Sequence, residues 1–200
     1  NNIDGFYMGA GLGMFNARAD NDFFTNSMKD LSTTLSLSTG SAQGLLGYGQ
    51  QIGSGYVGAE VAYRYVFANG DGTENPDPGE VDVKHFAADN TFSFSLRGGF
   101  FAFPNILMYC ALGVGYTQFS FDTRDTQGTL RQTKHWEPGV LPGIGMQVNL
   151  QNHLSLDVRY TYGFYQGSST KSSTAVGSIE TKLDNPQVNT TDINLVYHFV

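Results

Sequence analysis

The sequence predicts an all-β fold: a transmembrane up-and-down antiparallel β-barrel of eight strands, with short periplasmic turns and four long extracellular loops. Three observations predict this fold. Apolar and polar residues alternate in eight segments, short and long connections alternate between those segments, and glycine dominates their polar face. The length of 200 residues suits a single domain over residues 1–200.

The clearest alternation runs from Leu154 to Phe164, where even-numbered residues are aliphatic or aromatic and odd-numbered residues are polar, charged or glycine. A period of two places successive side chains on opposite faces of a strand. Seven further segments share the pattern, and the second of them is the weakest: 6–14, 45–49, 56–67, 91–97, 106–117, 136–148 and 192–199.

The connections between these segments alternate in length. Short ones lie near 51–54, 101–105 and 151–152, and long ones span about 17–43, 68–90, 122–134 and 166–187. Outer-membrane barrels keep short turns in the periplasm and long loops outside, so an even number of strands leaves both termini in the periplasm. The first long connection contains Phe23, Phe24 and several leucines, which predicts either a hairpin beyond the membrane or an apolar patch for a partner.

Alternation alone also fits a soluble eight-stranded barrel with an apolar interior, such as a lipocalin. The polar face favours the membrane. A soluble exterior would carry many lysines, but all five lysines fall in the predicted long connections. Glycine suits the narrow interior of eight strands, whereas an arginine or lysine facing lipid costs about 2–4 kcal/mol. The charged residues with inward parity are Glu60, Arg64, Arg97, Glu137, Asp157, Arg159 and Asp192.

Composition excludes several other classes. No run of about 18 apolar residues occurs, which excludes a transmembrane helix. The net charge of -7 argues against nucleic acid as a partner. Cys110 is the single cysteine, so no internal disulfide forms, and we expect it to face lipid. We identify no cofactor and no metal site, because His85 and His135 are isolated.

Several segments resemble the OmpA-like and opacity-protein-like barrels. Residues 5–13, Gly-Phe-Tyr-Met-Gly-Ala-Gly-Leu-Gly, are similar to the first strand of that family, and 56–65 and 154–160 resemble its third and seventh strands. Residues 195–199, Leu-Val-Tyr-His-Phe, resemble the strand that the outer-membrane assembly machinery reads through aromatic residues, here Tyr197 and Phe199. The family usually ends on that phenylalanine, and Val200 follows it here.

The resemblance implies a Gram-negative outer membrane, a largely closed barrel and roles in surface contact or envelope integrity. It also implies a role for the lumen charges, because small family members use such ion pairs as a plug or gate. By strand position, Glu60, Arg97, Glu137 and Arg159 match that cluster best. Removing one member of a buried pair costs about 3–5 kcal/mol, so the charges form either structural salt bridges or a gate.

Three other features have alternative interpretations. The acidic segment 69–89 is either a solvated loop or a place where divalent cations bridge to lipopolysaccharide phosphates. The sequence His153-Leu154-Ser155 resembles the His-x-Ser pair of lipid A deacylases, but its place beside a short turn and the lack of an orienting carboxylate argue against catalysis. Pro138 and Pro142 predict a distortion or a bulge in the sixth strand.

The function that follows is that of a non-enzymatic surface protein of the outer membrane, with loops that mediate adhesion, host interaction or envelope protection. A narrow or gated channel is the alternative, and a lipid A-modifying enzyme is third. Its partners would be the lipid bilayer, lipopolysaccharide, the assembly machinery and a host ligand, and we expect a monomer. Export requires a signal peptide, which we expect to have been removed.

Overall fold

The computed structural model is built of β-strands, and it describes residues 3–25, 28–67, 82–124, 130–151, 153–166, 168–174 and 177–199. Within these residues no helix is long and apolar enough to cross a membrane. The strands are β1 (Gly5–Thr25), β2 (Met28–Ile52), β3 (Gly55–Val66), β4 (Asp82–Phe103), β5 (Ile106–Arg124), β6 (Leu130–Gln151), β7 (Leu154–Tyr165), β8 (Ser168–Thr174) and β9 (Gly177–His198).

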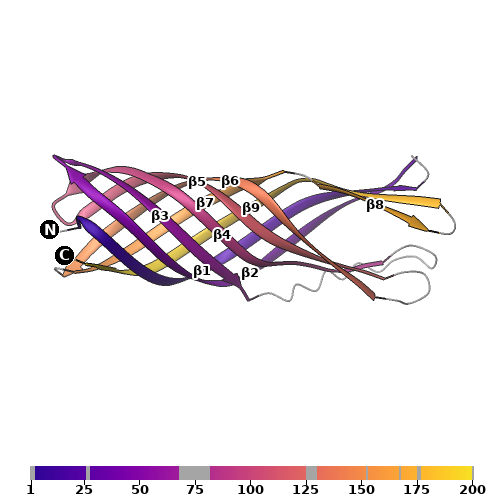
Figure 1. Ribbon diagram of the computed structural model, residues 1–200, viewed down its shortest axis with the longest axis horizontal. Coiled ribbons are helices and arrows are strands. Elements are labelled where there is room, and N and C mark those ends of the chain that lie inside the picture. The colour runs from indigo at the N-terminus through magenta and orange to yellow at the C-terminus, as the bar shows by residue number, and fades with distance from the viewer. Residues whose placement is uncertain are drawn as a thin grey trace.

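The strands form one closed antiparallel barrel (Figure 1). Strands β1 to β7 pair in sequence order, β7 pairs with β9, and β9 pairs back with β1, where Tyr7 stands opposite His198. Closure leaves no free strand edge around the barrel wall. The predicted eight-stranded up-and-down barrel is therefore confirmed.

The ninth strand does not add to the barrel, because β8 continues the line of β7. Both pair with β9 in one register, β7 as far as Phe164–Gln187 and β8 from Ser168–Leu183 onward. Pro186 of β9 lies between these two pairings, and proline has no N–H to donate to a ladder. The interruption therefore divides one strand line into two segments.

The two ends of the barrel differ. At one end, the turn end, short turns at 53–54, 104–105 and 153 join the strands, and both termini lie there (Figure 1). Gly53 has a φ of 62°, a left-handed conformation that suits a tight hairpin. At the opposite end, the loop end, the strands continue well beyond the predicted segments.

Much of the predicted long connections is strand. Residues 17–25 and 28–43 belong to the β1–β2 hairpin, so the hairpin alternative is confirmed for this connection. Strand also covers 82–90, 122–124, 130–134, 168–174 and 177–187. The predicted strands ended too early because apolar and polar residues alternate only where one face of a strand meets lipid. Backbone pairing between the strands continues in water, where the side chains need not alternate. The rest of these connections, with Asp71, Glu74, Asp77 and Glu80, lies outside the described residues.

Beyond the barrel the strands separate into two sheets, the outer sheets (Figure 1). β3 ends at Val66 and β7 at Tyr165, so the pairings that involve these strands stop there. One outer sheet continues in the order β8-β9-β1-β2, and the other in the order β4-β5-β6.

The outer face of the barrel is apolar, as its parity predicts. Leu12, Leu112 and Ile144 are 66%, 62% and 61% exposed, and Cys110 lies on the same face. Aromatic residues form a girdle near each end of this face. At the turn end they are Phe6, Tyr48, Phe100, Phe103, Tyr197 and Phe199, and at the loop end Tyr65, Phe67, Phe92, Tyr116, Trp136 and Phe164. Such girdles mark the two interfaces of a membrane.

Pro138 and Pro142 interrupt the β6–β7 ladder. The register is the same on both sides of Pro142, and two intervening positions are unpaired. The N–H of Gln166 donates to Pro138 O, so even-numbered residues of β6 direct their backbone groups toward β7, and Pro142 removes one donor there. The predicted distortion is present, but without an inserted residue and therefore without a bulge.

The first prediction concerns the depth of the apolar face. Leu112→Arg places a charge near the middle of the belt and should lower the free energy of unfolding in lipid vesicles by about 2–4 kcal/mol. Phe103→Arg, in the turn-end girdle, is the control and should cost about 0–1 kcal/mol. Denaturant titration of both variants measures the difference. Equal costs at the two depths would contradict the assignment of this face to lipid.

Candidate functional site in the barrel lumen

The lumen is lined by glycines on which tyrosine rings lie. A Cβ atom added at Gly47, Gly49, Gly139 or Gly145 would collide with the ring of Tyr7, Tyr56, Tyr165 or Tyr109 respectively. Glycine is needed at these positions because a large ring occupies the space of its missing side chain. Inward glycine therefore has a specific use, which is to make room for aromatic residues that fill the barrel.

Four charged residues meet near the middle of the lumen, and we call them the central ion cluster: Glu60, Arg97, Asp157 and Arg159. Nη1 of Arg159 donates to Glu60 Oε1 at 2.7 Å, and Nη2 of Arg97 lies 2.5 Å from Glu60 Oε2. Asp157 Oδ2 lies 3.4 Å from Arg159 Nη2 and 3.7 Å from Arg97 Nη2. Two cations and two carboxylates thus balance, as buried charges require.

Two tyrosines complete the cluster. The Tyr109 hydroxyl donates to Asp157 Oδ1 at 2.5 Å and accepts from Nε of Arg159 at 3.1 Å. The guanidinium of Arg97 lies 4.6 Å from the ring centre of Tyr109 and 5.6 Å from that of Tyr7, within the range of cation–π attraction. Neither tyrosine was among the predicted site residues, although each is a large aromatic residue on a face otherwise rich in glycine.

A second ion pair lies toward the loop end and is connected to the first group. Arg64 donates through Nη2 to Asp192 at 2.6 Å and to Gln43 at 3.1 Å. Gln43 donates to Asn194 at 2.7 Å, and Asn194 donates to Asp157 at 3.1 Å. Six of the seven predicted lumen charges therefore belong to one polar network.

Glu137 is buried but lies apart from this network. Among the described residues no ion pair includes it. Arg97 stands level with Ala111, which pairs with Gly143 of β6, whereas Glu137 pairs with Thr117. Six residues, about 20 Å along β6 at about 3.3 Å per residue, separate Glu137 from Gly143, which is in register with Arg97. Parity alone could not reveal this difference in position along the strands.

The turn end of the lumen is filled by a different set of contacts. Ile3 is buried and packs with Tyr56, Leu107, Tyr109 and Ala111. Beside this group lies a polar cluster of Gln147, Asn149, Ser155 and His198, in which the Ser155 hydroxyl donates to Asn149 at 2.8 Å and lies 3.1 Å from Nε2 of His198. Neither group was predicted from the sequence, since only the inward parity of their residues could have indicated them.

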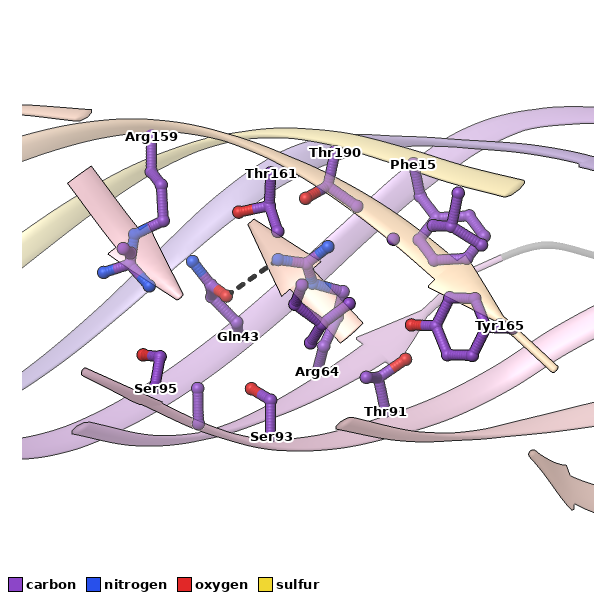
Figure 2. Close-up of a pocket in the computed structure, with 15 residues that line it drawn as sticks. Phe15, Gln43, Arg64, Thr91, Ser93, Ser95, Arg159, Thr161, Tyr165 and Thr190 are labelled. Carbon is purple, nitrogen blue, oxygen red and sulfur yellow. Dashed lines mark hydrogen bonds between the residues drawn. The ribbon is translucent and has the colours of Figure 1, made fainter. Parts of the chain in front are cut away.

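A small cavity lies between the central ion cluster and the loop end, and Arg64 lines it (Figure 2). Arg159 stands at one end of it, and Phe15 and Tyr165 at the other, with serine and threonine hydroxyls along its wall (Figure 2). Its volume of about 50 Å³ accommodates a few water molecules. Above it, Phe15 and Phe119 are buried, and the Phe119 and Tyr165 rings pack edge to face at 5.6 Å.

The lumen is thus filled at three levels: the Ile3 group at the turn end, the central ion cluster, and the aromatic group at the loop end. Among the described residues no three histidines, cysteines or carboxylates are placed to hold a metal ion. The arrangement can hold charge in the membrane interior and resist the passage of solutes. Its ion pairs could also exchange partners, because both arginines of the cluster face two carboxylates.

Comparison with known proteins identifies the family. The sequence profile of the outer membrane protein beta-barrel domain matches residues 1–199. The chain belongs to this family. The apolar belt of this outer membrane barrel therefore lies in the bacterial outer membrane. No curated protein sequence is similar enough to count as a match.

Solved structures share the fold of this outer membrane barrel. OprG of Pseudomonas aeruginosa is 15% identical over 98% of each chain, with a TM-score of 0.60. Neisserial surface protein A is 13% identical over 98% of each chain, with a TM-score of 0.51. The outer membrane protease OmpT of Escherichia coli is 10% identical over 99% of this chain and 98% of its own, with a TM-score of 0.54. At these identities the likeness establishes the fold alone.

The second prediction tests the energetic role of the central ion cluster. Glu60→Gln removes a carboxylate that faces two arginines and should lower the free energy of unfolding by about 3–5 kcal/mol. Glu137→Gln is the matched control, because Glu137 is buried and forms no ion pair with the described residues, and it should cost less than about 1 kcal/mol. Urea titration in lipid vesicles measures both. Similar losses in the two variants would show that the ion pairs do not determine stability.

The third prediction tests the fit of tyrosine on glycine. Gly145→Ala forces the Tyr109 ring to move and should lower the free energy of unfolding by about 1–3 kcal/mol. Gly44→Ala is the control, since a Cβ at Gly44 meets no atom within 4 Å. The same titration compares them. If both changes proved neutral, the interior would be loosely packed and this description of the lumen would be wrong.

Proposed function

We propose that this protein is a non-enzymatic surface protein of the outer membrane whose loop-end strands bind a partner outside the cell, in adhesion, host interaction or envelope protection. The observation that carries the proposal is the pair of outer sheets, which continue the barrel strands past the loop-end girdle. A passive membrane anchor does not need such extensions. Regions that project from a rigid scaffold commonly carry binding function.

The filled lumen supports a surface role over an open pore. Buried side chains occupy the lumen at the turn end, at the central ion cluster and below the loop end, as Ile3, Arg97 and Phe119 illustrate with 2%, 2% and 0% exposure. Eight strands leave an interior just wide enough for side chains. Diffusion of solutes through this barrel would require several of these groups to move together.

The contacts of the histidines support a non-enzymatic role. Nδ1 of His153 lies 3.2 Å from the carbonyl oxygen of His198, so His153 does not serve Ser155. The histidine that does contact Ser155 is His198, which is buried in the lumen and bonds to no carboxylate among the described residues. A serine nucleophile needs an oriented base and access to substrate. The protease among the structures of similar fold shows that the fold itself permits catalysis.

A narrow or gated channel is the second candidate, and one observation favours it. The cavity and the exchangeable partners of Arg97 and Arg159 resemble the parts of a gate. Planar-bilayer recordings of the wild type and of Arg97→Ala test it. Conductance that rises in Arg97→Ala would support gating, and silent traces from both proteins would remove this candidate.

We also propose that Tyr197 and Phe199 guide insertion by the assembly machinery. Both rings face outward in the turn-end girdle, with their centres 5.2 Å apart, on the strand that closes the barrel against β1.

A monomer surrounded by lipid and lipopolysaccharide accounts for the continuous apolar belt, because closure leaves no edge in the wall through which a second barrel could pair.

The fourth prediction tests the surface function. The outer hairpins are those of β1–β2, β5–β6 and β8–β9. Shortening each of them in turn to the level of the loop-end girdle should abolish binding of expressing cells to host cells or matrix for at least one hairpin. The barrel beneath should still assemble, because its wall pairings are complete without the extensions. Heat-dependent gel mobility and surface labelling serve as controls for assembly. Unchanged binding and unchanged serum survival for every shortened variant would overturn the proposed function.

A further inference from the structure

We propose that the edge of β2 from Leu31 to Thr39, the β2 edge, binds an extended polypeptide segment of another protein by adding it as a strand to the outer sheet. The inference rests on the proposed surface function. It names the element that would hold the partner and the chemical class of that partner.

Backbone pairing leaves the β2 edge open. On one side β2 pairs with β1 throughout this range. On the other side β3 ends at Val66, and the N–H of Phe67 donates the last bond, to Gly40 O at 2.9 Å. Beyond that bond none of the residues that the structure describes pairs with the β2 edge.

The direction of the free groups follows from the alternation of an antiparallel ladder. Because Gly40 bonds toward β3, the other even-numbered residues of β2 direct their N–H and C=O groups to the same side. The backbone groups of the edge that pair with no described residue are therefore those of Ser32, Thr34, Ser36 and Ser38. They form a regular row of donors and acceptors outside the loop-end girdle, which is the template that strand addition requires.

The β2 edge has a longer stretch without charge or proline than the other outer edges have. Lysine, other charges and proline on an edge discourage unwanted pairing. The edges of the two outer sheets carry such residues on β4 (Asp82, Lys84 and Asp89), β6 (Arg131, Lys134 and Pro138) and β8 (Lys171). The β2 edge reads Leu-Ser-Thr-Thr-Leu-Ser-Leu-Ser-Thr, nine residues without a charge or proline, and Lys29 and Asp30 precede it on β2. This uncharged stretch is the place where an incoming strand meets the least resistance.

The pattern of the edge also suggests what pairs with it. Leucine recurs at the odd-numbered positions 31, 35 and 37, between serines and threonines. Opposed residues of neighbouring strands stabilise each other when their apolar character matches. The favoured partner is therefore an uncharged, extended segment with aliphatic or β-branched residues at alternate positions.

A second copy of this chain fits the edge less well. Copies in one membrane share the direction of the barrel axis, so two β2 edges that met side by side would run parallel. Two-fold symmetry would then place even-numbered residues opposite even-numbered residues. In a parallel ladder, however, a residue whose backbone groups bond to the neighbouring strand stands opposite a residue whose backbone groups point away from it. The geometry thus favours a segment that is free to approach in the antiparallel direction.

The test uses the full chain in detergent micelles and a fluorescein-labelled peptide in which valine and threonine alternate between two terminal lysines. Amide hydrogen exchange should show protection of Ser32, Thr34, Ser36 and Ser38 when the peptide is added. Thr34→Pro removes an N–H from the open side only and should weaken binding by about tenfold, whereas Thr34→Val keeps it and should bind as the wild type does. N-methylation of alternate peptide residues on the pairing side should abolish binding.

Three results would overturn the inference: no peptide-dependent protection, equal binding by Thr34→Pro and Thr34→Val, or protection of these amides before peptide is added. The last would mean that the edge is occupied by this chain or by a second copy. Cell adhesion separates the two proposals. If adhesion is lost on shortening the β1–β2 hairpin but kept in Thr34→Pro, the proposed surface function stands and the β2 edge is not the element that binds. If the peptide binds but no shortened hairpin changes adhesion, the β2 edge accepts a strand and the proposed surface function is wrong.

Discussion

In the hydrocarbon core of a membrane each backbone N–H and C=O must find its partner within the protein, and the rest of this structure depends on that requirement. It closes β1 against β9, because an open sheet would leave two edges in lipid. Closure with eight strands fixes a narrow interior. A narrow interior in turn excludes bulk water, so the lumen must be filled by side chains that satisfy one another.

The filling combines two solutions. Tyrosine rings lie on glycines of neighbouring strands and occupy the volume that those glycines leave free. Between the rings, arginine guanidinium groups bond to carboxylates on distant strands, as Arg159 of β7 does to Glu60 of β3. Arginine suits this position because its planar fork of donors can bond to several acceptors at once. Packing and charge pairing thus stabilise the same layer of the barrel.

The sequence was sufficient to predict the fold, the orientation of its faces and the set of charges that enter the lumen, because all three depend on a period of two. It was insufficient where height along the barrel matters. Glu137 has the same parity as Arg97 but a different level, and only the register of β4, β5 and β6 reveals this. Strand length at the loop end was also underestimated, since residues paired in water need not alternate.

The seam between β1 and β9 has a consequence for the order of folding. Tyr7 and His198 come from opposite ends of the chain, so their pairing has a far greater sequence separation than any hairpin contact. Hairpins such as β2–β3 can form locally and early, whereas the ring closes last. Until then, the first and last strands expose unpaired backbone at the membrane surface. Ile3, which precedes β1, finds its pocket only after β3 and β5 are in place, so its burial would report that the barrel has assembled at least as far as β5.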